Sequence, residues 1–407
     1  MQPLTLIIEG SYYDSQIYSG RLYLWTNEGS LLTVDWDALV TDINVPKRLR
    51  LPLVCALQRS EYLYGQSFKL IFNDEEINQL ISQKFADLAA TPIEITKSIL
   101  QKYIIREQDN NLPFPHADTN IYRNTLYVGD KSGIVGAIIN RRNKRVISLD
   151  HTKLWDGPVI NIAASYATLA LSAGNEGLFE YPLGHSYIDA STNKRPRLLE
   201  SHPSNAARWL YASVFSSSYI TEGYLADFVV EKESKDDHER KTLTDRRKLR
   251  DIVPAEQIFG QVLSVDSAKY AWGAHDKLCL ATSKSIEIVR YQPNNEARRF
   301  EDLGFIDTDL NQGDVISADS ALFGYVIEKE NGLLVIDSQM QTMWLPGEPV
   351  NWRVFPRSKF YTNQLHAVYD ECLCVHSFNN DYLVDQKTKK VGIRFAQDFL
   401  RNQRQQY

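Results

Sequence analysis

Several signatures of well-known enzyme classes are missing from this chain. There is no Gly-rich phosphate loop of the form GxxxxGKS/T, so ATP hydrolysis of that kind is not expected. There is no HExxH sequence and no paired CxxC motif, which argues against a standard zinc site. The Gly-x-Ser-x-Gly nucleophile elbow is missing as well. From these absences we expect no catalytic residue, no metal ligand and no cofactor.

Cysteine and long apolar runs are also scarce. The chain has four cysteines in 407 residues, namely Cys55, Cys279, Cys372 and Cys374. Cys372 and Cys374 would share one face of a strand, and we interpret the set as lone buried thiols in a reducing cytosol. No stretch approaches the roughly 18 apolar residues of a membrane span. The start, Met1–Glu9, lacks the basic region of a signal peptide and is expected to form a β-strand. These features predict a cytoplasmic protein without a membrane partner.

What the chain does contain is a repeated pattern of two apolar runs joined by a turn. Three copies are clear, at Arg21–Val34, Thr125–Ile138 and Leu169–Tyr181. In each copy the turn is built from Gly, Asn, Asp or Ser, the residues that favour tight hairpins. Each copy therefore predicts two β-strands joined by a short hairpin.

The spacing of these hairpins predicts the architecture. From Gly133 onward the centres recur at intervals of roughly 45 to 55 residues, about the length of one four-stranded propeller blade. We expect an all-β fold, a single β-propeller domain over residues 1–407 with seven blades, and six or eight blades as the alternatives. The expected centres are Gly29, Gly133, Gly177, Glu231, Ser285, Gly332 and Asn380.

These segments resemble the blades of a WD40-like β-propeller. Gly129–Val135 is similar to the turn between the third and fourth strands of such a blade. The signature residues of the family are poorly represented, because no Trp-Asp pair closes a blade at the expected place. Trp155-Asp156 lies ahead of Gly157-Pro158 and not at a strand end. The resemblance therefore implies the fold of a divergent propeller and carries over no binding residue.

A propeller of this kind must join its two ends. We expect Leu4–Ile8 to pair in one sheet with a strand from the C-terminal part, near Leu373–Phe378 or Val391–Phe395. Such pairing removes an open sheet edge and ties the ring shut.

One region departs from the strand pattern and predicts a helical hairpin over residues 74–106. Apolar residues from Ile77 to Leu88 recur at helical spacing, and Asn73 or Asp74 can cap the helix. A second helix is expected from Thr91-Pro92. The hairpin is expected to lie between blades, where it covers a sheet edge or blade flank, or docks a partner. In the second case the contact residues are Gln79, Gln83 and Lys97.

A second departure is the highly charged stretch over residues 231–250. Mixed charge with few apolar residues predicts a flexible solvated loop. Its basic half is a candidate contact for an acidic protein surface or for nucleic acid, although the net charge of -6 argues against general nucleic-acid binding. The candidate partner-binding residues are Arg246, Arg247, Lys248 and Arg250. Replacing these four residues by Ser is expected to leave folding intact. The end of the chain, residues 398–407, is expected to be a polar tail.

Three classes of function remain open from the sequence. The leading one is a non-catalytic protein-interaction scaffold or regulatory subunit of a cytoplasmic multi-protein complex, with one or more proteins as partners. The first alternative is a nucleic-acid-associated accessory subunit that uses the basic loops. The second is a hydrolase or lyase that uses aspartates in the central channel, although aspartates are also common in β-turns. The channel candidates are Asp266, Asp314, Asp319, Asp370 and Asp381.

Overall fold

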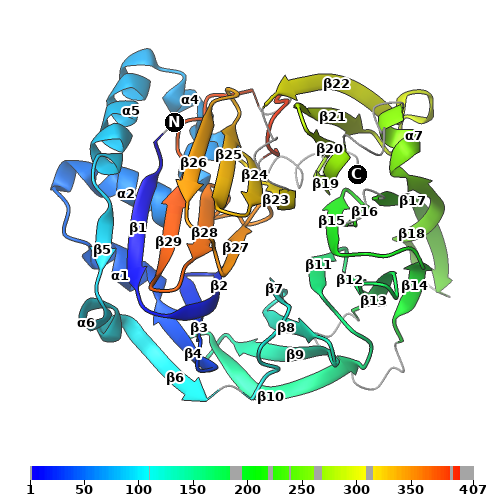
Figure 1. The fold of residues 1–407 in the computed structure, drawn as a ribbon, viewed down its shortest axis with the longest axis horizontal. Coiled ribbons are helices and arrows are strands. Elements are labelled where there is room, and N and C mark those ends of the chain that lie inside the picture. Colours follow the sequence, from blue (N-terminus) through cyan, green and yellow to red (C-terminus); the bar gives the residue numbers. More distant parts are fainter. Residues whose placement is uncertain are drawn as a thin grey trace. The chain divides into compact units, whose positions relative to one another are not determined.

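The structure, a computed structural model, describes most of the chain (Figure 1). The described ranges are 2–109, 111–183, 195–218, 223–237, 240–260, 268–308, 315–385 and 388–394. The polar tail at 398–407 lies outside them. No helix in these ranges is long and apolar enough to cross a membrane. The chain divides into two compact units, the first comprising 1–111, 140–147 and 316–407, and the second 112–139 and 148–315.

The first unit contains three sheets. Two have four strands, in the orders β2-β3-β4-β6 and β23-β24-β25-β26, and the third has the order β27-β28-β29-β1-β5. The strands are β1 (Leu4–Glu9), β2 (Tyr12–Tyr18), β3 (Arg21–Thr26), β4 (Ser30–Asp35), β5 (Ile93–Ile95), β6 (Ile104–Asp109), β23 (Val315–Ser320), β24 (Gly324–Lys329), β25 (Gly332–Asp337), β26 (Thr342–Pro346), β27 (Asn351–Val354), β28 (Gln364–Val368) and β29 (Cys372–Ser377).

The second unit holds four sheets of four strands, each built from strands that follow one another in sequence. The strands are β7 (Asp118–Tyr122), β8 (Thr125–Asp130), β9 (Gly133–Asn140), β10 (Val146–Trp155), β11 (Asn161–Ser165), β12 (Thr168–Ser172), β13 (Leu178–Pro182), β14 (Arg197–Glu200), β15 (Ala206–Leu210), β16 (Ser213–Ser217), β17 (Tyr224–Asp237), β18 (Arg240–Pro254), β19 (Ala268–Ala274), β20 (Lys277–Thr282), β21 (Ser285–Tyr291) and β22 (Phe300–Asp307). Helix α7 (Ala255–Phe259) follows β18, and the 3-10 turn η4 (Glu296–Arg298) precedes β22.

Within the described residues, these seven sheets, antiparallel except for the parallel pairing of β5 with β1, are the blades of a β-propeller, as the sequence predicted. The single-domain organisation over 1–407 stays a prediction. The turn at Gly129–Val135 was predicted to join the third and fourth strands of a blade, and this position is wrong by one strand. That turn joins β8 to β9, the second and third strands of their sheet.

The glycines of the repeat have a common steric cause. Gly133 begins the third strand of its sheet with φ 136°, and a Cβ there would lie 2.0 Å from the carbonyl oxygen of Trp155 on the fourth strand. Gly177 stands in the same place in the next sheet, with φ 100° and a distance of 2.1 Å to the oxygen of Glu200. Only glycine fits such an approach without displacing the backbone. The recurrence of glycine in the sequence therefore marks the recurrence of the blade.

Two of the expected hairpin centres are wrong. Glu231 lies inside β17, paired with Arg246 of β18, and Asn380 lies beyond the end of β29. Neither residue is a glycine, so neither marks the close approach described above.

The predicted pairing of the two chain ends is confirmed. Strand β1 runs antiparallel to β29, with Leu4 opposite Ser377 and Glu9 opposite Cys372. Strand β5 then adds to the other edge of β1 in parallel, with Ile7 opposite Glu94. The N-terminal strand is thus an interior strand of a sheet whose other main strands come from the C-terminal part.

The helical region is larger than predicted and lies elsewhere. It interrupts one blade between its third strand, β4, and its fourth, β6, and does not lie between blades. We call residues 36–103 the insertion. Its elements are α1 (Trp36–Asp42), η1 (Lys47–Leu49), α2 (Arg50–Leu57), α3 (Glu61–Tyr64), α4 (Gln66–Phe72), α5 (Glu75–Ala89), β5, α6 (Lys97–Leu100) and η2 (Gln101–Tyr103).

The helical hairpin over 74–106 is confirmed in its first half only. Helix α5 forms where expected, and the Asp74 carboxylate accepts hydrogen bonds from the amides of Glu76 (3.0 Å) and Ile77 (3.1 Å). The second helix is wrong at its start, because residues 93–95 form strand β5, and only the short helix α6 and the turn η2 follow it. Two β-branched residues at alternating positions suit a strand, and pairing with β1 decides the conformation.

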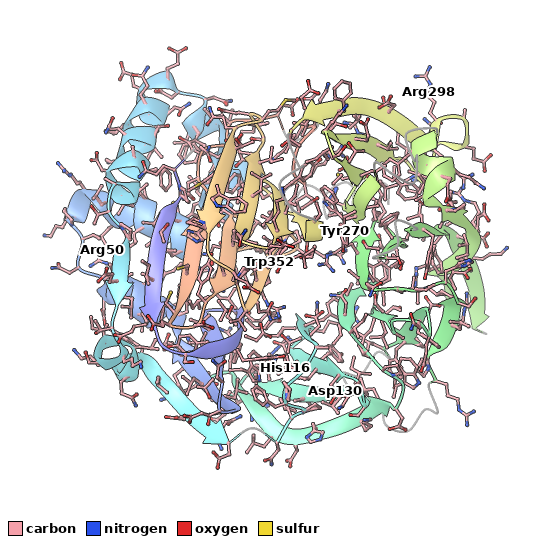
Figure 2. All side chains as sticks on the ribbon, in the orientation of Figure 1. Arg50, His116, Asp130, Tyr270, Arg298 and Trp352 are labelled. Carbon is pink, nitrogen blue, oxygen red and sulfur yellow. The ribbon has the colours of Figure 1, made fainter. Side chains whose placement is uncertain are left out.

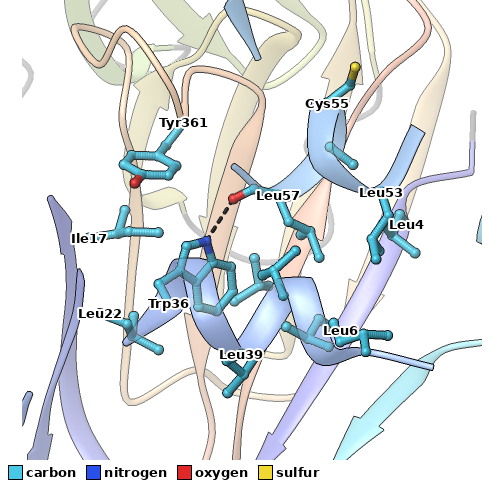
Figure 3. Packing of buried hydrophobic residues seen from close by; sticks show 14 of the residues in the cluster. Leu4, Leu6, Ile17, Leu22, Trp36, Leu39, Leu53, Cys55, Leu57 and Tyr361 are labelled. Carbon is cyan, nitrogen blue, oxygen red and sulfur yellow. Dashed lines mark hydrogen bonds between the residues drawn. The ribbon is translucent and has the colours of Figure 1, made fainter. Parts of the chain in front are cut away.

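The insertion shares one core with the sheet of β1. Trp36 is fully buried, and its indole N–H donates to the carbonyl of Leu57 at 2.7 Å (Figure 3). Leu4 and Leu6 of β1 belong to the same cluster as Leu53 of α2. The expectation that this region covers a sheet edge or blade flank is therefore confirmed.

The charged stretch over 231–250 is not a loop. It forms most of a long antiparallel hairpin, in which β17 and β18 pair from Tyr224↔Pro254 to Asp237↔Arg240. The neighbouring strand β16 pairs with β17 only at Tyr224–Ala226. The remaining length is thus a two-stranded ribbon, whereas the high charge density had predicted a loop.

Candidate interaction surface

The insertion exposes an unusual amount of apolar side chain on two adjacent helices. On α4, Phe68 is 36% exposed, Leu70 81% and Ile71 48%. On α5, which packs against α4, Ile77 is 37% exposed and Leu80 56%. Large apolar groups gathered on a surface mark interaction sites more often than scattered ones do. We call these five residues the α4–α5 apolar surface.

Helix α5 is apolar on more than one side, which explains why part of its stripe stays outside. Ile81, Phe85 and Leu88 are buried in the core shared with β1, whereas Ile77 and Leu80 are not. Burial of the inner residues holds the helix in place. Ile77 and Leu80 keep 37% and 56% of their surface exposed.

Tyr382, which follows β29 in the chain, fixes both helices from behind. Its ring meets that of Phe72 edge-on at 5.2 Å and lies 6.4 Å from that of Phe85. Its hydroxyl donates to the Asn78 side-chain oxygen at 3.1 Å and lies 2.9 Å from the Ser82 hydroxyl. The α4–α5 apolar surface is therefore held in position by packing against Tyr382, and a rigid scaffold of this kind is typical of recognition surfaces.

A buried ionic network lies in the segment around Tyr382 and helps to hold that segment in place. The Lys389 ammonium contacts the Asp381 carboxylate and the Leu322 carbonyl, and both charged side chains are almost fully buried. The Tyr64 hydroxyl donates to the other Asp381 oxygen at 2.9 Å. Burial, followed by the charge of Asp381, raises the pKa of Tyr64 well above its usual value, so this phenol stays a donor.

The start of α5, beside the surface, carries negative charge. Asp74, Glu75 and Glu76 are all exposed at the start of α5. Asp74 is occupied as the helix cap, and the two glutamates favour the positive end of the helix. On α2, the exposed side of the insertion carries Arg50, whose guanidinium donates to the Thr41 carbonyl at 2.6 Å (Figure 2).

The three predicted contact residues of this region are all exposed. Gln79 and Gln83 lie on α5, and the Gln83 amide donates to Asp87 at 3.0 Å. Lys97 lies on α6, which packs against β1, and its backbone N–H donates to the Glu9 carboxylate at 3.2 Å. The structure thus places the two glutamines beside the α4–α5 apolar surface and Lys97 on a separate element.

Sequence analysis missed the apolar residues of α4. Their spacing, with Phe68, Ile71 and Phe72 at i, i+3 and i+4, is a helical signal that could have found them. The importance of Tyr382 had no local signal, because its partners lie some 300 residues away.

The basic residues of β18 have different environments from one another. Arg247 is mostly enclosed, with its guanidinium 3.4 Å from the Phe228 ring centre and 4.8 Å from that of Trp209. It pairs with Glu180 at 2.8 Å and donates to the Ala212 carbonyl at 2.6 Å. Burial lowers the pKa of Arg247, opposed by the Glu180 charge. This side chain is therefore part of the packing between two sheets of the second unit.

Arg250 is also engaged internally. Its guanidinium contacts the Asp227 carboxylate twice, at 2.8 and 2.9 Å, and Arg299 reaches the same carboxylate at 2.7 Å. Asp227 is fully buried and is also contacted by the Tyr291 hydroxyl. A buried carboxylate needs such compensation. The structure therefore uses Arg250 to neutralise a buried charge.

Lys248 is exposed, and its ammonium lies 3.6 Å from the Glu231 carboxylate. Arg246 lies opposite Glu231 in the strand register. The structure thus does not bring Arg247 and Arg250 to the surface beside Lys248. A partner-binding role of the four residues stays a prediction.

The acids considered for a channel site do not gather in one place in the described part of the chain. Asp319 is buried and its carboxylate accepts the Ser320 amide at 2.7 Å. Asp370 lies on an exposed turn, and Asp381 belongs to the Lys389 network. Asp266 and Asp314 lie outside the described ranges. Among described residues, no three His, Cys, Asp or Glu side chains are grouped to hold a metal ion.

Comparison with known proteins adds little beyond the fold. No protein-family model matches the sequence, and no curated protein matches it either. Among solved structures, the chain is similar to the β-propeller domain of Myceliophteria thermophila Cps50 (Swd1). The identity is 8%, the match covers 91% of this chain and 97% of that one, and the TM-score is 0.49.

Two further solved structures are similar over about two thirds of the chain. The WD40 β-propeller domain of Doa1 is 8% identical over 66% of this chain and 98% of its own, with a TM-score of 0.35. A chain of a mitotic checkpoint complex is 10% identical over 64% of this chain and 74% of its own, with a TM-score of 0.39. All three scores are below 0.5, so the fold assignment rests on the seven sheets themselves.

Proposed function

We propose that this chain is a protein-interaction module of a cytoplasmic multi-protein complex and that its insertion docks a partner protein. The observation that carries the proposal is the α4–α5 apolar surface. Five large apolar side chains stay exposed on helices that Tyr382 and the shared core hold in place. A blade needs no helix between its third and fourth strands, so the insertion is an addition to the repeat. Its inner face stabilises the fold, and its outer face is available for recognition.

Charge and burial favour a protein partner over nucleic acid. The net charge is -6, and the exposed side chains at the start of α5 are acidic. Of the basic candidates, Arg247 and Arg250 are engaged with Glu180 and Asp227. A phosphate backbone is bound by exposed basic groups.

The proposal predicts that charge placed on the α4–α5 apolar surface abolishes partner capture. Leu70→Glu and Leu80→Glu change exposed side chains, so the melting temperature should stay within a few degrees of that of the unmodified chain. Partners would be identified by quantitative affinity capture from the native host with the unmodified chain as bait. Each variant should then lose the same partner, because a buried charge at an apolar interface costs several kcal/mol.

Phe305→Glu is the matched control. Phe305 is 60% exposed on β22 of the second unit, and the change removes a similar apolar side chain. This variant should retain the partner. Retention of the partner by both leucine variants, with Gln79→Arg and Gln83→Arg also binding normally, would refute the docking role of the insertion.

A further inference from the structure

Two of the four cysteines form a close pair. Cys372 and Cys374 lie on the same face of β29, and their sulfur atoms are 3.8 Å apart. Both are half-buried and both are free thiols. Cys55 and Cys279 are fully enclosed, as the sequence predicted, but the description of lone buried thiols is wrong for this pair.

The strand that carries the pair is held on both sides. Strand β29 pairs with β28 and with β1, so its backbone cannot shift easily. Residues two apart on a strand have Cα atoms about 6.6 Å apart, and their side chains point the same way. The two sulfurs are therefore presented together from a rigid base.

The short distance between the two sulfurs bears on what the pair can bind. Two thiolates at this separation repel each other unless a cation lies between them. A metal ion that replaces both protons would remove this repulsion.

The number of available ligands restricts which ion fits. Zinc sites in proteins use three or four side-chain ligands. In the described residues no third His, Cys, Asp or Glu joins this pair to make such a site. Soft thiolate ligands favour Cu(I), which needs no more than two of them. We propose that Cys372 and Cys374 form a two-thiolate site for Cu(I).

The binding step balances without any redox change. Both thiols release their protons to solvent, and one Cu(I) ion forms a bond to each sulfur. Metal–thiolate bonds of about 2.3 Å in a line separate two sulfurs by about 4.6 Å. The sulfurs must therefore move apart by about 0.8 Å from their present 3.8 Å, which small side-chain rotations supply.

The test titrates the full, reduced chain without oxygen against the coloured Cu(I) complex of bathocuproine disulfonate. The unmodified chain should remove a single Cu(I) ion from the chelator, with release of protons. Cys372→Ser and Cys374→Ser should each abolish this transfer. The Cys55→Ala, Cys279→Ala double variant is the matched control and should bind as the unmodified chain does.

A second measurement avoids any variant that might misfold. N-ethylmaleimide should label Cys372 and Cys374 of the folded, unmodified chain, and Cu(I) should protect both, as mapped by mass spectrometry. Labelling that Cu(I) leaves unchanged, or transfer that survives in either serine variant, would overturn the site.

Discussion

At the scale of single residues, Arg247 stabilises the fold although it lies in a highly charged stretch of the sequence. Its guanidinium lies on the Phe228 ring and pairs with Glu180 of a neighbouring sheet in the second unit. We now expect Arg247→Ser to destabilise the chain by about 2–3 kcal/mol, because the partly buried Glu180 carboxylate loses its partner. This reverses the sequence-based expectation that serine at the basic positions leaves folding intact. Urea unfolding followed by circular dichroism measures the change.

Two further variants separate this mechanism from a general effect of charge removal. Lys248→Ser removes the exposed neighbour and should change the unfolding free energy by less than about 0.5 kcal/mol. Arg247→Lys keeps the charge but not the planar group on the ring, so it should recover only part of the loss. Equal effects of Arg247→Ser and Lys248→Ser would show that the ring and Glu180 contacts contribute nothing.

At the scale of elements, the β17–β18 hairpin shows why composition misled. The register places Lys232 opposite Asp245 and Asp236 opposite Lys241, so residues of opposite charge type occupy partner positions in the two strands. Such cross-strand pairs stabilise a hairpin, whereas like charges destabilise it. Net composition sums these charges and hides their pairing, which only the register reveals. The helix α5 was predictable because its cap and its apolar spacing are both local. Strand β5 was not, because its conformation depends on β1, far away in the sequence.

The ribbon carries its own prediction. Lys232→Glu puts like charges opposite each other and should weaken the hairpin by about 0.5 kcal/mol, and Asp245→Lys should do the same. The double variant restores opposite charges in the reverse order and should recover most of the stability. Hydrogen exchange of the amides at 229–237 and 240–248 reports the local effect, which melting of the whole chain would miss. Additive losses in the double variant would contradict pairing across this register.

At the scale of the whole molecule, the glycine repeat helped to make the blade architecture predictable, because the same steric restriction returns at Gly133, Gly177 and Gly332. The position of the insertion was not predictable, since only strand order shows that β6 completes the blade of β2–β4. The sequence directed attention to α5 through Gln79 and Gln83, whose role as contacts stays a prediction, but it did not identify the α4–α5 apolar surface. Its α4 half and its support by Tyr382 depend on contacts between distant parts of the chain.

The pairing of β1 with β29 makes the sheet of the C-terminal strands depend on the first residues of the chain. Leu6 and Ile8 are fully buried in the core shared with the insertion. Deleting residues 1–9 should therefore lower the melting temperature and favour aggregation, since β29 and β5 would both expose an unpaired edge. Leu6→Ala should cost about 2–4 kcal/mol through the cavity alone, with the strand still paired. A synthetic peptide of residues 2–10, added while the truncated chain refolds, should restore much of the lost stability because it supplies the missing strand. An unchanged melting temperature after truncation would show that β1 is dispensable, and failure of the peptide with an intact core would show that the strand must be covalently attached.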